Sequence, residues 1–350
     1  MDARKDLPVL IAVILLALIL AGEFVVFSAG HGDYGSDVVF GEDSISYEIR
    51  SNGPHVYDVV VMDGSAGSPT DVSVYYDPSY ASNISDVMVA VGGRALDQEY
   101  YVQQMGGTLR MRGVDDVSTI DADDMLALME SPGKGHALVC LSGSLPSDVY
   151  DGTPDSPVFK WLASGGRLYW AGNAIGAYCS EGETLRDIGS EGTALFLGSD
   201  CIEGDSRIAY GECPDGSCSA FSFQNNQIAY SPSIGKLPSD RAHAHFGFSD
   251  GERSSISLIQ YGEGFVCIIG GDYSNFQRID LGQVIASGLS PTTVIVDHIH
   301  GSVNGRTTGT ALAGDHVYIS LGGYFPVYGE LKEADRCSMT RSSCARASPP

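Results

Sequence analysis

Short apolar runs alternate with amphipathic segments through the middle of the chain. The runs at 72–76, 137–141 and 167–171 are bounded by polar or turn-forming residues, as expected of buried strands in a parallel sheet. The expected order is strand 72–76, helix 95–105, strand 108–114, helix 118–129, strand 137–141, helix 156–164 and strand 167–171. This order predicts an α/β fold in which helices flank a parallel sheet.

Capping and turn-forming residues mark the expected ends of the helices. Gly106-Gly107 is expected to end the first helix, and Ser118 or Asp121 can cap the second. Pro157 occupies the first position of the third helix, which Gly165-Gly166 is expected to end. These signals support three separate helices between the strands.

The alternation is interrupted after residue 176. Residues 177–260 are rich in Gly and Ser and contain no long periodic helix, which predicts an insertion with antiparallel strands. The pattern resumes with a strand at 264–270 and a helix at 280–287. Further strands are expected at 293–296, 317–321 and 324–328. We expect this last group to pair with early strands at 45–62, so that β strands are added at both ends of the fold.

A long apolar run lies near the N-terminus. From Val9 to Phe27 it spans 19 residues, interrupted only by Glu23, which is close to the ~20 residues that a membrane-spanning helix needs. Arg4 and Lys5 precede the run, which places the N-terminus in the cytoplasm by the positive-inside rule. We therefore expect a single-pass protein of the cell membrane whose bulk is extracytoplasmic.

The alternative for the same segment is a cleaved signal peptide, with small residues at 28–30 for the peptidase, although the apolar run exceeds the usual length.

With an uncleaved anchor, the predicted divisions are a cytoplasmic N-terminus 1–8, an anchor 9–30, a juxtamembrane linker with β strands 31–70, an α/β domain 71–290 with its insertion 177–260, a β unit 291–332 and a disordered tail 333–350.

Charge narrows the classes of partner. The 350 residues include 44 Asp and Glu against 20 Lys and Arg, for a formal charge of −24. Such a surface repels polyanions, which argues against a nucleic-acid partner. The charged residues before residue 30 are Asp2, Arg4, Lys5, Asp6 and Glu23. Nearly all the acidity therefore belongs to the expected outer portion, where it suits a protein partner with a basic surface at the cell envelope.

Eight cysteines are compatible with disulfides in an extracytoplasmic protein. Cys213 and Cys218 flank a Pro-Asp-Gly-Ser turn and are expected to form a bridge. Cys179 and Cys201 are the second candidate pair, whereas Cys140 and Cys267 lie in apolar runs and are expected to be buried thiols. Asn83, in an Asn-Ile-Ser sequon, is a candidate for N-glycosylation.

Two His-x-His pairs could bind a metal. His243 and His245 form one pair, and His298 and His300 form the other. Residues two apart on a strand share a face, so each pair can direct two imidazoles to one point, and four imidazoles could hold zinc or another divalent ion. The alternative is two independent strand surfaces, since nothing in the sequence brings the pairs together.

The segments Leu141-Ser-Gly-Ser-Leu-Pro146 and Phe159 to Gly176 resemble the central part of class I glutamine amidotransferase-like domains. More specifically, they resemble divergent, membrane-anchored versions found in archaeal surface proteins. The similarity covers roughly residues 71–290 and implies a flavodoxin-like or class I amidotransferase-like parallel sheet. In active members of the family, a sharp G-x-C-x-G turn exposes a cysteine nucleophile that a histidine and an acid activate.

The matching turn departs from that motif. It consists of Gly172, Asn173, Ala174, Ile175 and Gly176, with alanine where the nucleophile belongs. The later strand ends at 268–273 without the expected histidine. The resemblance therefore implies a domain without catalysis and without a cofactor.

The expected function is thus a membrane-anchored binding or interaction protein. The sequence leaves two alternatives open. One is an extracytoplasmic metal-dependent hydrolase that uses the histidine pairs, and the other is a subunit of a cell-surface assembly.

Overall fold

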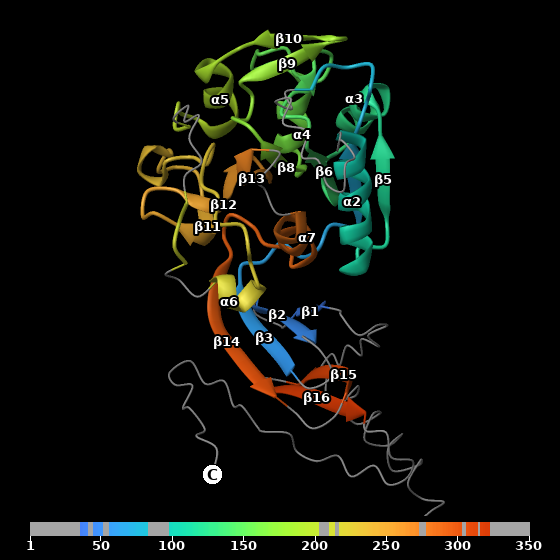
Figure 1. Cartoon of the computed structure of the whole chain (residues 1–350), viewed down its shortest axis with the longest axis vertical. Coiled ribbons are helices and arrows are strands. Elements are labelled where there is room, and N and C mark those ends of the chain that lie inside the picture. Colours follow the sequence, from blue (N-terminus) through green and yellow to red (C-terminus); the bar gives the residue numbers. More distant parts are fainter. Residues whose placement is uncertain are drawn as a thin grey trace, which may run out of the picture. The chain divides into compact units, whose positions relative to one another are not determined.

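The computed structural model describes residues 36–40, 45–51, 56–82, 98–202, 210–213, 217–272, 278–302, 306–313 and 316–322. The chain divides into two compact units, one formed by residues 62–297 and the other by the segments on either side of it. Figure 1 shows the elements of both units.

The larger unit is built on a seven-stranded sheet. Its strands, in spatial order, are β11 (His243–Ser249), β12 (Ser254–Tyr261), β13 (Gly264–Asp272), β8 (Arg167–Gly172), β6 (His136–Cys140), β4 (Asp71–Tyr75) and β5 (Val117–Ile120). The strands from β13 to β5 are parallel, and β12 and β11 extend the sheet antiparallel. The mostly parallel sheet is therefore confirmed. Counted along the chain and read from β5, the parallel strands have the order 2-1-3-4-5, which is common in doubly wound sheets.

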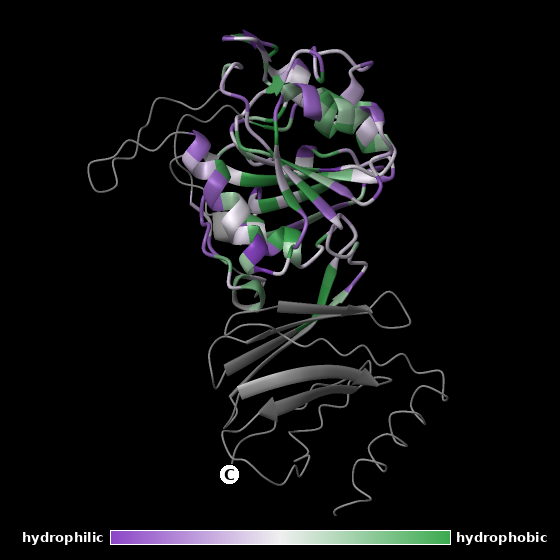
Figure 2. Cartoon of the chain, turned by 90° about the vertical axis from the view of Figure 1, so that its right-hand side faces the viewer, coloured by the Kyte–Doolittle hydropathy of each residue, from purple (hydrophilic) through white to green (hydrophobic). Residues whose placement is uncertain are grey.

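Helices cover both faces of this sheet. They are α2 (Gln98–Met111), α3 (Ala122–Glu130), α4 (Pro157–Ala163), α5 (Ser190–Leu197), α6 (Ser217–Phe221) and α7 (Arg278–Ala286), with a 3-10 turn η1 at Ile234–Lys236. Apolar residues of α3, α4 and α5 pack on one face against Leu138, Leu168 and Trp170. Helix α2 contacts β4 and packs beside α7. Figure 2 shows the apolar central strands between these helices.

Helix α2 differs from the prediction. It continues through Gly106-Gly107 to Met111, so the strand expected at 108–114 is wrong. The helix ends at Gly113, whose φ is +85°, where the Gly113 amide bonds to Arg110 O (3.1 Å) and the Val114 amide bonds to Leu109 O (3.1 Å). This is a Schellman ending, which satisfies the last carbonyls of the helix. The next strand, β5, lies within the segment predicted as the start of the following helix.

Two helix starts agree with the prediction. Asp121 caps α3, because its carboxylate accepts a hydrogen bond from the Asp124 amide at 2.9 Å. Pro157 occupies the first turn of α4, which ends before Gly165 and Gly166. These boundaries follow from local backbone chemistry, which is why the sequence places them well.

The strands of the predicted insertion belong to two different sheets. Strands β9 (Tyr178–Glu181) and β10 (Thr184–Asp187) form a hairpin that joins the short strand β7 (Leu145–Pro146) in a separate three-stranded sheet. Strands β11 and β12 instead lengthen the central sheet. The antiparallel strands expected between 177 and 260 are therefore confirmed.

The remaining strands form two smaller sheets. Strands β1 (Ser36–Phe40), β2 (Ile45–Ser51), β3 (Val56–Asp63) and β14 (Val294–Ser302) lie in that order, so the expected pairing between early and late strands is present. Strands β15 (Arg306–Ala313) and β16 (His316–Gly322) form a hairpin. The strand predicted at 324–328 and the tail 333–350 lie outside the described residues.

The described part of the chain contains no helix that is long and apolar enough to cross a bilayer. The predicted anchor at 9–30 lies outside the described residues.

Candidate functional site

The turn after β8 occupies the position of the predicted elbow, at the carboxyl edge of the central sheet. Gly172 and Gly176 have φ values of +115° and +74°, a backbone region that favours glycine. The chain then enters the strand β9. Ala174 is half-buried and packs against the core.

Buried side chains hold this turn by its backbone carbonyls. The Trp170 indole N–H donates to Asn173 O (2.7 Å), and the Thr193 hydroxyl donates to Ile175 O (2.8 Å). The Tyr150 hydroxyl donates to Gly176 O (2.8 Å). Donors from three different parts of the chain therefore satisfy three carbonyls of the turn, and these hydrogen bonds fix its shape.

Burial shields the free thiols near this turn. All four free cysteines among the described residues are buried: Cys140, Cys179, Cys201 and Cys267. Burial raises the pKa of Cys140 to about 11, against hydrogen bonds from Ser142 and its neighbours that lower it. A buried thiol that keeps its proton at neutral pH is a poor nucleophile.

The cysteine predictions have mixed outcomes. Cys213 and Cys218 form the expected disulfide, and Cys140 and Cys267 are buried as expected. The second predicted disulfide is wrong, because Cys179 and Cys201 are separate free thiols. Cys179 instead accepts a hydrogen bond from the Arg186 guanidinium at 3.3 Å.

The histidine pairs are described to different extents. His243 and His245 lie on β11 with their rings in contact, 3.0 Å between His245 Nε2 and His243 Nδ1. Burial, with a smaller contribution from the charge of His243, lowers the pKa of His245 to about 4. The side chains of His298 and His300, on β14, lie outside the described residues, as does Asn83. Within the described ranges, no three acidic, histidine or cysteine side chains are grouped to hold a metal.

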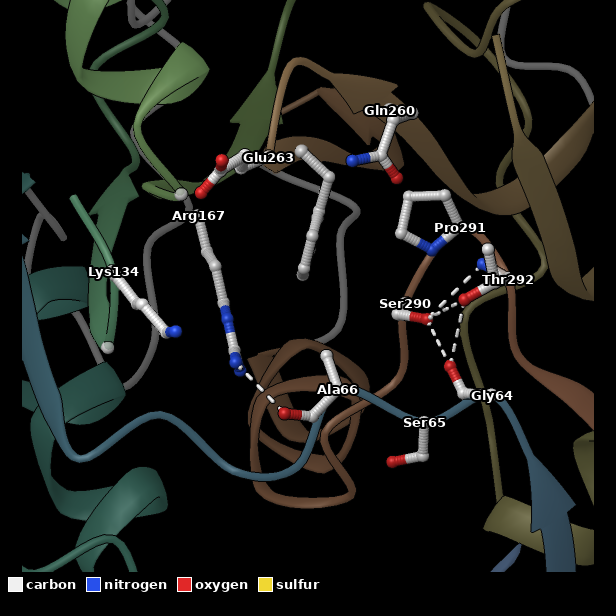
Figure 3. A pocket seen from close by; sticks show the side chains of 13 residues that line it. Gly64, Ser65, Ala66, Lys134, Arg167, Gln260, Glu263, Ser290, Pro291 and Thr292 are labelled. Atoms are coloured by element: carbon white, nitrogen blue, oxygen red, sulfur yellow. Dashed lines mark hydrogen bonds between the residues drawn. The ribbon is translucent and has the colours of Figure 1, made fainter. Parts of the chain in front are cut away.

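A polar cavity of about 410 Å³ opens at the opposite, amino edge of the sheet. Lys134 precedes β6, Arg167 begins β8, and Phe265 lies at the start of β13. The other lining residues are the segments 64–66 and 290–292 together with Gly135, Gly165, Gln260 and Glu263. Figure 3 shows Lys134 beside Arg167, with Ser290 and Thr292 across the cavity near Gly64. The sequence carried no signal for this cavity, because its residues are brought together only by the strand order.

Arg167 joins the two sides of the cavity wall. Its guanidinium donates to Gly67 O and, at 3.0 Å, to Ala66 O. It also lies over the Phe265 ring, 5.8 Å from the centroid. The guanidinium thus ties the 66–67 segment to the sheet.

We expect Arg167→Met to lower the free energy of unfolding by ~1–2 kcal/mol, because two carbonyls lose their donors. Arg167→Lys should recover only part of this, since a single ammonium lacks the planar fork. Urea denaturation measures both. Lys134→Met is the matched control: this exposed cation lines the same cavity, and in the described structure it has no hydrogen-bond or ion-pair partner. Equal effects at the two positions would contradict the assigned role of Arg167.

The chain matches no protein-family model and no curated protein.

Proposed function

We propose that this chain is a membrane-anchored, outward-facing binding or interaction protein, built on an amidotransferase-like domain that performs no catalysis. The 2-1-3-4-5 order of the parallel strands is the flavodoxin-like order and supports this type of domain. The acidic composition supports an exported, solvent-exposed domain.

The observation that carries the proposal is the turn at 172–176. Alanine occupies its centre, and three buried side chains donate hydrogen bonds to three of its five carbonyls. Nucleophilic catalysis requires an activated lone pair at this position, which a methyl group cannot supply. The turn therefore acts as a structural connection between β8 and β9.

The amino-edge cavity supports a role in binding. It combines two cations, Lys134 and Arg167, with the carboxylate of Glu263 and the amide of Gln260. Within a chain of formal charge −24, an excess of positive charge in a cavity favours a small ligand that carries a negative group. A protein partner with a basic patch would be attracted to the acidic surface outside this cavity, and not to the cavity itself.

A glutaminase assay on the full-length chain in detergent tests the absence of catalysis. We expect no ammonia release from glutamine above buffer, either for the wild type or for Ala174→Cys, because the segment 268–273 lacks the histidine that activates the cysteine in active members of the family. Ala174→Cys should nevertheless react with iodoacetamide faster than Ala171→Cys, a matched control that places a thiol at a fully buried position of β8. Glutamine hydrolysis by the wild type would refute the proposal.

A further inference from the structure

Two imidazole rings meet on β11, an edge strand of the central sheet. His243 and His245 are two residues apart, so their side chains project from the same face of the strand. Their ring centroids are 5.0 Å apart with an angle of 53° between the planes. The two facing nitrogens, His245 Nε2 and His243 Nδ1, are separated by 3.0 Å.

This separation suits two ligands of one metal ion. Nitrogens bound at 2.0–2.1 Å lie ~2.9 Å apart in a square-planar arrangement and ~3.3 Å apart in a tetrahedral one. The observed 3.0 Å lies between these values. For both nitrogens to bind one ion, the two rings must rotate so that their lone pairs meet at a common point instead of facing each other.

A buried hydroxyl orients the inner ring. Ser257 lies opposite His245 on β12 and is fully buried, and its Oγ lies 3.0 Å from His245 Nδ1. When Nδ1–H donates to this oxygen, Nε2 carries the lone pair. Metal-binding histidines are commonly oriented in this way by a hydrogen bond from the other ring nitrogen.

We propose that His243, through Nδ1, and His245, through Nε2, bind one divalent transition-metal ion of the zinc or copper class, with Ser257 as a positioning residue. Binding moves the proton of His243 from Nδ1 to Nε2, so that both ligands are neutral imidazoles. The described residues place no third metal-binding side chain at this pair. Water or a donor from a ligand would complete the coordination. The site needs neither the turn at 172–176 nor the amino-edge cavity, so it goes beyond the proposed function.

Copper(II) is the sharpest probe, because nitrogen sites bind it more tightly than other divalent first-row ions. The full-length chain, purified in detergent without a polyhistidine tag, is titrated with Cu²⁺ by calorimetry and examined by electron paramagnetic resonance. We expect one ion per chain and a hyperfine pattern from two coordinated nitrogens. The spectrum of the wild type reports the ligand number independently of any variant.

The variants assign the ligands. His243→Ala and His245→Ala should each weaken Cu²⁺ binding at least ~10-fold, since even the loss of a residue that orients a ligand costs this much. Ser257→Ala should weaken binding ~10-fold yet keep the two-nitrogen spectrum at saturating Cu²⁺. His136→Ala is the matched control: this histidine pairs with Asp71 elsewhere and should leave binding unchanged.

Three results would overturn the proposal. These are a wild type that binds no Cu²⁺, unchanged binding in the double variant His243→Ala/His245→Ala, and a wild-type spectrum with fewer than two nitrogens. The double variant His298→Ala/His300→Ala tests whether the second pair contributes. If it loses as much Cu²⁺ affinity as the His243 and His245 variants, and the wild-type spectrum shows four nitrogens, the site has four imidazole ligands and the two-imidazole proposal is wrong. Thermal melts of every variant establish that each compared protein is folded.

Discussion

Gly192→Ala is expected to lower the free energy of unfolding by ~3 kcal/mol. A β-carbon at this position of α5 would lie 2.0 Å from Gly176 O and 2.4 Å from the Tyr150 hydroxyl. It would thus overlap the turn at 172–176 and displace the hydroxyl that donates to Gly176 O. Urea denaturation followed by far-UV circular dichroism measures the loss.

A second helical glycine provides the matched control. Gly107 lies inside α2, and a β-carbon there would meet no atom within 4 Å. Gly107→Ala should therefore raise the free energy of unfolding by ~0.5–1 kcal/mol through helix propensity. The two substitutions are chemically identical, so effects of the same sign would show that the contact between α5 and the turn is not as described.

Asp280→Asn is expected to stabilise the chain increasingly as the pH rises. Asp280 is fully buried at the start of α7, where Oδ2 accepts from the Gln224 and Asn225 amides at 2.8 and 2.6 Å. Among the residues that the structure describes, none is a hydrogen-bond partner of its buried Oδ1. Burial raises the pKa of Asp280 to about 6, although the two amides and the charge of Arg112 lower it.

The direction of the pH effect follows from linkage. Because the folded state holds this proton more tightly than the unfolded state does, folding stability falls as the pH rises from about 4 to about 6. A difference of roughly two pKa units corresponds to ~3 kcal/mol. Asparagine does not titrate, so the stability of the variant relative to the wild type should increase by ~2–3 kcal/mol between pH 4 and pH 7.

Urea denaturation of both proteins at several pH values measures this difference. The comparison is insensitive to any fixed cost of burying the asparagine amide, because that cost does not depend on pH. Glu130→Gln, at an exposed position of α3, controls for the loss of one negative charge. A stability difference that stays constant from pH 4 to pH 7 would show that Asp280 is not held protonated by burial.

The α/β alternation could be predicted because its signals are local. Strands β4, β6 and β8 are short apolar runs between turn residues, and α4 begins at a proline. The end of α2 was misplaced because Gly106-Gly107 resembles a stop signal. In the fold, Gly106 lies on the buried face of α2, and packing against the sheet and α7 keeps the helix intact to Met111.

The candidate sites could be predicted only in part. Ala174 and its flanking glycines were visible in the sequence as an altered motif, and the spacing of His243 and His245 placed both rings on one face. The sequence could not show that Tyr150 and Thr193 hold the turn, since these donors come from distant segments. It also suggested a Cys179–Cys201 bridge, whereas both residues are free thiols in the structure.

The sequence by itself determined the apolar strands β4, β6 and β8, the starts of α3 and α4, and the alanine at the predicted elbow. These properties depend on side-chain chemistry within a few residues. The tertiary structure alone decided the strand order, the end of α2, the amino-edge cavity and the approach of Ser257 to His245. Each of these depends on which distant segments pack together, and that choice minimises the free energy of the whole fold rather than of any one segment.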